Sequence, residues 1–88
     1  MESKKIYAFS NPVRLKLLCC LNKKSSNVNE LIDNCGLAQS AVSQHLTKLK
    51  SAGLVKTNRR GKFIYYSLKD AKTGRLANDF YQYVKEVD

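Results

Sequence analysis

The chain has 88 residues, 43% of them hydrophobic, which indicates one small folded domain and excludes a disordered chain. Its formal net charge of +9 favours a polyanionic partner, with nucleic acid ahead of a membrane surface. No stretch approaches the roughly 20 apolar residues of a membrane span, and Met1 to Lys5 lead into no apolar run typical of a secretory signal. Three cysteines, two of them adjacent, do not indicate a disulfide framework, so we expect a cytoplasmic protein in a reducing compartment.

The first part of the chain predicts three helices, of which the first is short and covers about residues 2–10. The second follows in "SNPVRLKLLCCL", where Asn11 is a good N-cap and Pro12 suits the first helical position. The third lies in "NVNELIDNCG", where Asn27 and Glu30 have the spacing of a capping box and Gly36 supplies a C-cap.

A fourth helix is predicted over residues 39–52, within "AQSAVSQHLTKLKSAGLV", and Gly53 ends it. Its inward face has helical spacing and consists of Val42, His45, Leu46 and Leu49. Its outward face is polar and consists of Gln39, Ser40, Ser43, Gln44, Thr47 and Lys48. We interpret His45 as a hydrogen-bonded histidine at the rim of the core, in preference to a ligand or sensor. Two helices joined by a short turn indicate a helix-turn-helix.

After Gly53 the hydrophobic period changes to two, which predicts a β-hairpin of about residues 54–58 and 62–68. We expect Arg59, Arg60 and Lys62 at its tip. Ile64, Tyr66 and Leu68 should face one way, and Phe63 and Tyr65 the other. A last helix is predicted over about residues 70–86, with Asp70 as a plausible N-cap, although Gly74 favours a start after that position. The fold class is therefore mainly α with a β-hairpin (α+β).

Three stretches resemble the arsenical-resistance-repressor (ArsR) family of bacterial winged helix-turn-helix regulators: "FSNPVRLKLLCCL", "NELIDNCGLAQSAVSQHLTKLKSAGLV" and "RRGKFIYYSL". The resemblance covers roughly residues 6–68. It implies one winged helix-turn-helix domain over residues 1–88, with four helices, two strands and a final helix in that order. It also implies a homodimer, in which the terminal helices (about 2–10 and 70–86) meet through Ile6, Phe9, Leu76, Phe80 and Val84.

The resemblance further implies a repressor that occupies an operator, with helix 39–52 in the major groove and the hairpin as a wing. Gln and Ser side chains can bond base edges, so the candidates for base contact are Gln39, Ser40, Ser43 and Gln44. Thr47 and Lys48 lie further along the helix and are expected at phosphates. Arg59, Arg60 and Lys62 of the wing (58–62) are expected at the DNA backbone or minor groove. The family usually begins this helix with a Ser cap, where Ala38 stands here.

Metal-sensing members of the family carry a Cys-x-Cys run before the recognition helix, or Asp and His ligands in the last helix. Here Cys35 is alone in the first region, and residues 69–88 contain neither His nor Cys, so we expect no metal and no cofactor. Other members sense reactive sulfur or oxidants through a cysteine pair. Cys19 matches one member of that pair, and its partner in the last helix is missing. We expect free, buried cysteines, with a thiol sensor at Cys19 or Cys20 as the alternative hypothesis.

The sequence leaves other binding functions open beside a sequence-specific transcriptional regulator. A non-specific architectural DNA-binding protein would fit the high charge, and a winged-helix protein-interaction module would fit the fold. An enzyme is not expected, because the chain has no acid–base pair, no nucleophile with a plausible base and no Gly-rich phosphate loop. Ser43 and His45 do not form a dyad, since residues two apart on a helix point to different faces.

Overall fold

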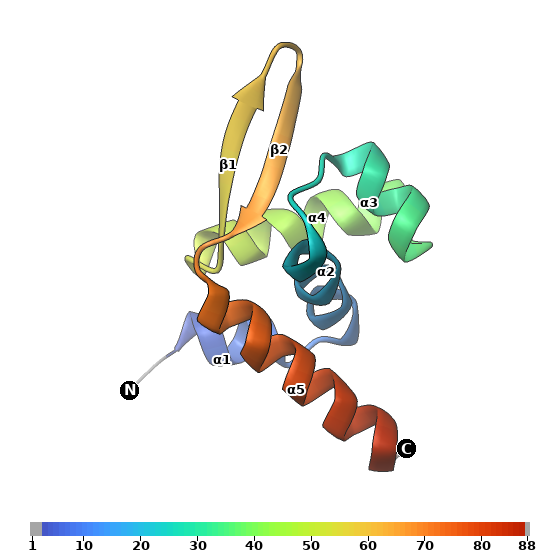
Figure 1. The fold of residues 1–88 in the computed structure, drawn as a ribbon, viewed down its shortest axis with the longest axis vertical. Coiled ribbons are helices and arrows are strands. Elements are labelled where there is room, and N and C mark those ends of the chain that lie inside the picture. The colour runs from blue at the N-terminus through green and yellow to red at the C-terminus, as the bar shows by residue number, and fades with distance from the viewer. Residues whose placement is uncertain (1–2, 88) are drawn as a thin grey trace.

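A computed structural model describes residues 3–87 of the chain, with side chains through Lys85. The described residues form five helices and one antiparallel hairpin, in the predicted order (Figure 1). The elements are α1 (Lys4–Phe9), α2 (Pro12–Lys23), α3 (Val28–Cys35), α4 (Gln39–Ser51), β1 (Val55–Arg60), β2 (Phe63–Leu68) and α5 (Ala71–Val87). This is a winged helix-turn-helix, as expected. No helix among residues 3–87 is both long and apolar enough to cross a membrane.

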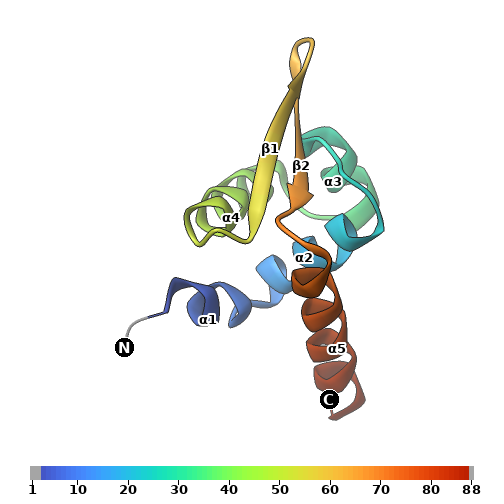
Figure 2. The same cartoon turned by 60° about the vertical axis from the view of Figure 1, so that its left-hand side comes forward.

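Helix α2 lies at the centre of the molecule and contacts all four other helices and β2. Leu17 and Leu18 have no exposed surface. They pack with Leu31 of α3 and with the inward residues of α4. The hairpin projects from the end of the molecule opposite to α1 and α5 (Figure 2). The hairpin therefore lies at one end of the molecule and α1 and α5 at the other, while α4 also contacts α1.

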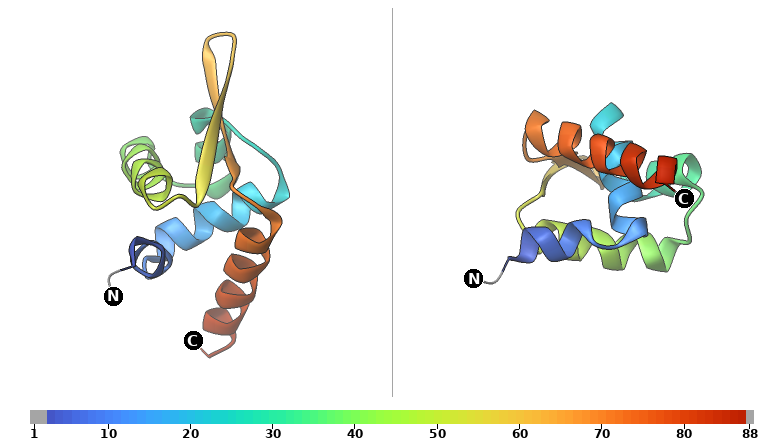
Figure 3. Two further views of the ribbon diagram at one scale, coloured as in Figure 1. Left: turned by 90° about the vertical axis from the view of Figure 1, so that its left-hand side faces the viewer. Right: turned by 90° about the horizontal axis from the view of Figure 1, so that it is seen from below.

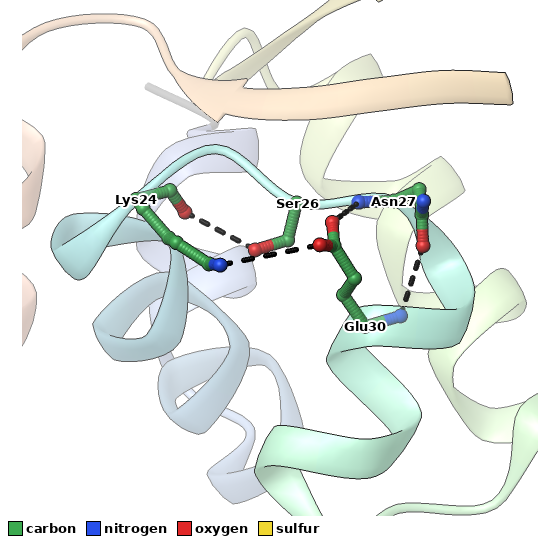
Figure 4. A network of polar contacts seen from close by, with 4 residues as sticks. All are labelled: Lys24, Ser26, Asn27 and Glu30. Carbon is green, nitrogen blue, oxygen red and sulfur yellow. Dashed lines mark hydrogen bonds and ion pairs between the residues drawn. The ribbon is translucent and has the colours of Figure 1, made fainter.

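The predicted caps of α2 and α3 are present. Asn11 Oδ1 accepts hydrogen bonds from the amides of Val13 and Arg14 at 2.9 and 3.1 Å. Asn27 and Glu30 form the reciprocal capping box, with bonds of 2.9 and 3.0 Å between each side chain and the other residue's amide (Figure 4). These bonds satisfy amide groups that a helix start otherwise leaves unpaired.

The hairpin turn is shorter than predicted, because β1 continues through Arg60 and only Gly61 and Lys62 connect the strands. Gly61 has φ +62°, as the mirror-image turns of two-residue hairpins require. Arg59 and Arg60 consequently lie in a strand, where successive side chains point to opposite faces. The pairing runs without a break from Val55 with Leu68 to Arg60 with Phe63, so β2 is a regular strand in which successive side chains alternate between the two faces.

Helix α5 begins at Ala71 and includes Gly74, so the expectation of a start after the glycine is wrong. Asp70 Oδ1 accepts from both the amide and the hydroxyl of Thr73 at 2.8 Å, which confirms the predicted N-cap. A Cβ at position 74 would collide with the side chain of Asn22 and lie 2.8 Å from a methyl group of Leu68. The glycine is thus explained by the close approach of α5 to α2 and β2.

The expectation of three free cysteines is also wrong, because Cys20 and Cys35 are joined as a disulfide. Their Cα atoms are 6.8 Å apart, across the contact between α2 and α3. Periodicity places each cysteine on the apolar side of its own helix but does not reveal which residues of another helix face it.

Candidate nucleic-acid interface

The outward face of α4 carries six polar residues with exposed side chains. They are the predicted Gln39, Ser40, Ser43, Gln44, Thr47 and Lys48. The opposite face is anchored in the core by Val42, Leu46 and Leu49, each at most 1% exposed. Ala38 provides no side-chain cap at the start of α4. The packing therefore fixes which side of α4 faces solvent and leaves the first-turn amides available to an external acceptor.

The far end of this face adjoins α1. Lys48 and Thr47 line a groove of about 350 Å³ together with Lys4 and Tyr7. The Thr47 hydroxyl donates to the carbonyl of Ser43 at 3.1 Å, so its proton is already used within the helix. Lys4 was not among the predicted contacts, because only packing of α1 against α4 brings it beside Lys48.

The wing presents its cations in different ways. The guanidinium of Arg60 lies over the ring of Tyr65, 4.5 Å from its centroid, on the outer face of the hairpin. Arg59 belongs to the opposite face, and its Nε donates to the Gly61 carbonyl at 3.1 Å. Both side chains are exposed and held close to the hairpin. The sequence led us to expect the wing cations together at the hairpin tip. The structure instead holds Arg59 and Arg60 on opposite faces of the hairpin.

A groove of about 310 Å³ lies between the wing and the starts of α3 and α4. Gln39 and Ser43 line it from α4, and Lys62 lines it from the hairpin turn. Asn29, in the first turn of α3, also lines this groove and is exposed. Sequence analysis missed Asn29, since no pattern along the chain places α3 beside β2.

His45 lies at the rim of the core and is hydrogen-bonded, as interpreted from its position. Its Nδ1 is 3.2 Å from Nη1 of Arg14, a residue of α2 that is only 3% exposed. Burial lowers the pKa of His45, and the positive charges of Arg14 and Lys48 lower it further. No pattern in the sequence distinguishes Arg14 from an exposed arginine. Its contact with His45 was therefore not predicted.

The three cysteines are in two different states. Cys19 is half-buried, and its Sγ lies 3.6 Å from the carbonyl of Ala77 in α5. Burial raises the pKa of the Cys19 thiol, although Lys23 partly opposes the shift. Cys20 is bonded to Cys35 and is not a free thiol. Among residues 3–87 no three His, Cys, Asp or Glu side chains converge as metal ligands would.

An apolar groove of about 570 Å³ separates α1 from α5, on the side of the molecule away from the wing. Ile6, Phe9, Leu76 and Phe80 line it, and Ile6 and Leu76 are 68% and 55% exposed. The fifth predicted interface residue, Val84, lines an adjoining pocket with Phe9 and Phe80. Figure 3 shows α5 extending past α2 with one side uncovered. The structure thus brings the five predicted residues to one continuous surface.

The domain model for the arsR family of bacterial regulatory proteins matches residues 11–57. The chain belongs to this family. It is 42% identical over 72 residues to the biofilm growth-associated repressor of Xylella fastidiosa, covering 82% of this chain and 63% of that protein. The chain therefore spans less than two thirds of that relative's length.

Two solved structures of the family have the same fold. The crystal structure of the transcriptional repressor BigR from Xylella fastidiosa superimposes with a TM-score of 0.80 at 38% identity, covering 90% of this chain and 81% of that one. The solution structure of a homodimeric winged helix-turn-helix DNA-binding domain from Mycobacterium bovis gives 0.79 at 29% identity, covering 94% and 76%. These comparisons confirm the family and the fold expected from the sequence.

Proposed function

We propose that the protein is a sequence-specific DNA-binding transcriptional regulator, a homodimeric repressor that binds an inverted-repeat operator. The observation that carries this proposal is the exposed polar face of α4, which adjoins a basic hairpin in a chain of net charge +9. A purely solvated face would need neither the short hydrogen-bonding side chains at the start of α4 nor cations beside them.

In this proposal α4 enters the major groove. Gln39, Ser40, Ser43 and Gln44 would read base edges, because amide and hydroxyl groups there match the donor and acceptor pattern of the bases. Thr47 and Lys48 would bind phosphates. The wing would follow the DNA backbone with Arg59, Arg60 and Lys62, whose charges fix the register of the complex but carry little sequence information.

The apolar groove between α1 and α5 supports self-association, since a contiguous apolar surface of this kind marks an interface. The Mycobacterium bovis relative is homodimeric, and its fold is the same. We infer that Ile6, Phe9, Leu76, Phe80 and Val84 form the contact. The dimer would place two α4 helices about 34 Å apart, one turn of duplex, which is why the operator should be an inverted repeat.

The test is selection of bound duplexes from a random pool, with reduced and with oxidised protein. The proposal predicts a single enriched inverted repeat and loss of enrichment with Gln44→Ala. Leu76→Asp in the dimer groove should give a monomer that selects no repeat. Lys16→Gln, on an exposed position of α2, is the matched control and should select the same repeat.

Other outcomes would favour the alternatives. Retention of DNA without any enriched sequence would indicate an architectural binder. No retention of DNA at all would indicate a protein-interaction module.

A further inference from the structure

The buried Arg14 side chain joins three helices. From α2, its Nε donates to the carbonyl of Ala8 at 3.0 Å and its Nη2 to the carbonyl of Tyr7 at 3.0 Å. These carbonyls belong to the last turn of α1, and the Tyr7 carbonyl also accepts from the amide and the hydroxyl of Ser10, at 3.1 and 2.6 Å. The third nitrogen, Nη1, faces His45 Nδ1 of α4 at 3.2 Å. One planar guanidinium thus links the end of α1 to the middle of α4.

The contact between Arg14 and His45 requires a neutral imidazole. Arginine has only donors, so His45 Nδ1 must be the acceptor and Nε2 must carry the proton. The charged groups that act on His45 are Arg14 from α2 and Lys48 from α4. From α1, Lys4 and Tyr7 line the groove that contains Lys48. A second proton on His45 would therefore be repelled by the nearby cations and would break the hydrogen bond between His45 and Arg14.

A second bond attaches the C-terminal end of α4 to the same helix. Lys5 Nζ of α1 donates to the carbonyl of Ala52, the C-cap of α4, at 3.1 Å. His45 and Ala52 are seven residues apart, about two turns of helix, and both are linked to α1, His45 through Arg14 and Ala52 directly through Lys5. Two points of attachment along α4 restrict its direction relative to α1, which one point would not do.

We propose that Arg14 is a positioning residue, which couples the dimerisation helix α1 to the recognition helix α4 through His45. This inference rests on the proposed function and extends it to how α4 is held. Ile6 and Phe9 of α1 lie on the inferred dimer surface, so α1 has a fixed place in the dimer. Arg14 then fixes the distance between α4 and the α4 of the partner subunit. The two half-sites of an operator can be bound together only when that distance is correct.

The DNA-binding test compares two probes, the duplex selected from the random pool and a random duplex of equal length. Arg14→Met and His45→Phe should each weaken binding to the selected duplex about tenfold or more, with binding to the random duplex changed less than about twofold. Non-specific binding depends on charge at phosphates and not on the spacing of two helices. Lys16→Met, which removes one charge from the exposed side of α2, is the control and should leave the preference for the selected duplex intact.

A second measurement uses no DNA and keeps the inference testable if no duplex is selected. His45 is the only histidine in the chain, so its imidazole nitrogens give a single set of NMR signals. In wild type they should report the Nε2-protonated tautomer. Arg14→Met should raise the pKa of His45, since a repelling charge is removed, and should speed amide exchange in the second half of α4. Arg14→Lys keeps the positive charge, so it should leave the pKa of His45 lowered, but it should not restore slow amide exchange, because an ammonium cannot donate in three fixed directions.

Equal loss of binding to both DNA probes would reduce Arg14 to a structural residue and overturn the inference. So would an unchanged His45 pKa and unchanged exchange in folded Arg14→Met protein. Absence of any selected duplex, with the NMR changes present, would instead count against the proposed function and leave the link between α1 and α4 established.

Discussion

Ser26 and Tyr66 exchange two backbone hydrogen bonds, from the Ser26 amide at 3.0 Å and from the Tyr66 amide at 2.8 Å. This isolated bridge joins β2 to the segment between α2 and α3. It lies next to Asn27, the N-cap of α3. The wing is therefore fastened at its base to the helix-turn-helix and is not free to swing about its connections to α4 and α5.

Removal of one of the two bonds of this bridge should loosen the wing. Ser26→Pro lacks the amide and leaves the Tyr66 carbonyl without its donor, which should lower the free energy of unfolding by about 1–3 kcal/mol. Ser26→Gly is the matched control, because it loses the hydroxyl and keeps the amide. Urea unfolding measures the difference, and amide exchange at Tyr66 locates it. Equal effects of the two variants would show that the bond from the Ser26 amide contributes nothing.

Most of the fold could be predicted from the sequence, because local signals specify it. Asn11 with Pro12, Asn27 with Glu30, and Gly36 and Gly53 mark helix ends through chemistry within a few residues. Helical and alternating periods then identify the buried faces. The exposed face of α4 follows from those periods as well, whereas the shared surface of α1 and α5 was expected from the resemblance to the family.

The missed features all depend on contacts between distant segments. Nothing near Arg14 indicates that His45 will face it, and nothing near Cys20 indicates Cys35. Gly74 was expected to favour a later start of α5, but the intrinsic cost of glycine in a helix is small, about 1 kcal/mol, and tertiary packing outweighs it. Arg60 was placed in the turn because the sequence locates the turn by Gly61 but does not reveal how far the pairing of β1 with β2 extends.

The disulfide between Cys20 and Cys35 closes a loop of 15 residues. Chain-entropy reasoning assigns about 3 kcal/mol of stability to a loop of this length. Unfolding in urea with and without a reductant should differ by about that amount, and Cys20→Ser should match the reduced wild type. Cys19→Ser is the control and should remain sensitive to reductant. Titration of the denatured, unreduced protein should find one thiol, and three thiols would contradict the assignment.

A methyl group at position 74 should destabilise the protein, although alanine is more favourable than glycine in a helix. Gly74→Ala should destabilise the protein by about 1–3 kcal/mol, since overpacking outweighs the gain in propensity. Asn22→Ala opens the space that the new Cβ needs, so the double variant should recover part of the loss. Thermal or urea unfolding measures both. A more stable Gly74→Ala single variant would contradict the close packing of α5 at this point.

The stability of the fold should fall in mildly acidic solution because of His45. Its pKa in the folded protein is lowered below the ordinary 6.5, so the unfolded chain binds the proton more readily. The contribution of neutral His45 to the free energy of unfolding is complete above about pH 6.5. It is lost as the pH falls towards the pKa of His45 in the folded protein. Urea midpoints measured between about pH 7.5 and 5 should decline in wild type and decline less in His45→Gln. Parallel declines would exclude His45 as the cause.

The most direct test of the central claim is a competition titration of the selected duplex against random duplex at several salt concentrations. The account predicts that the selected duplex binds about a thousandfold tighter or more, and that its affinity falls steeply between about 50 and 200 mM salt. Gln44→Ala should lower this ratio, and Lys48→Ala should weaken both duplexes and reduce the salt dependence. Equal affinity for the two duplexes, or an affinity that does not change with salt, would contradict a sequence-specific regulator.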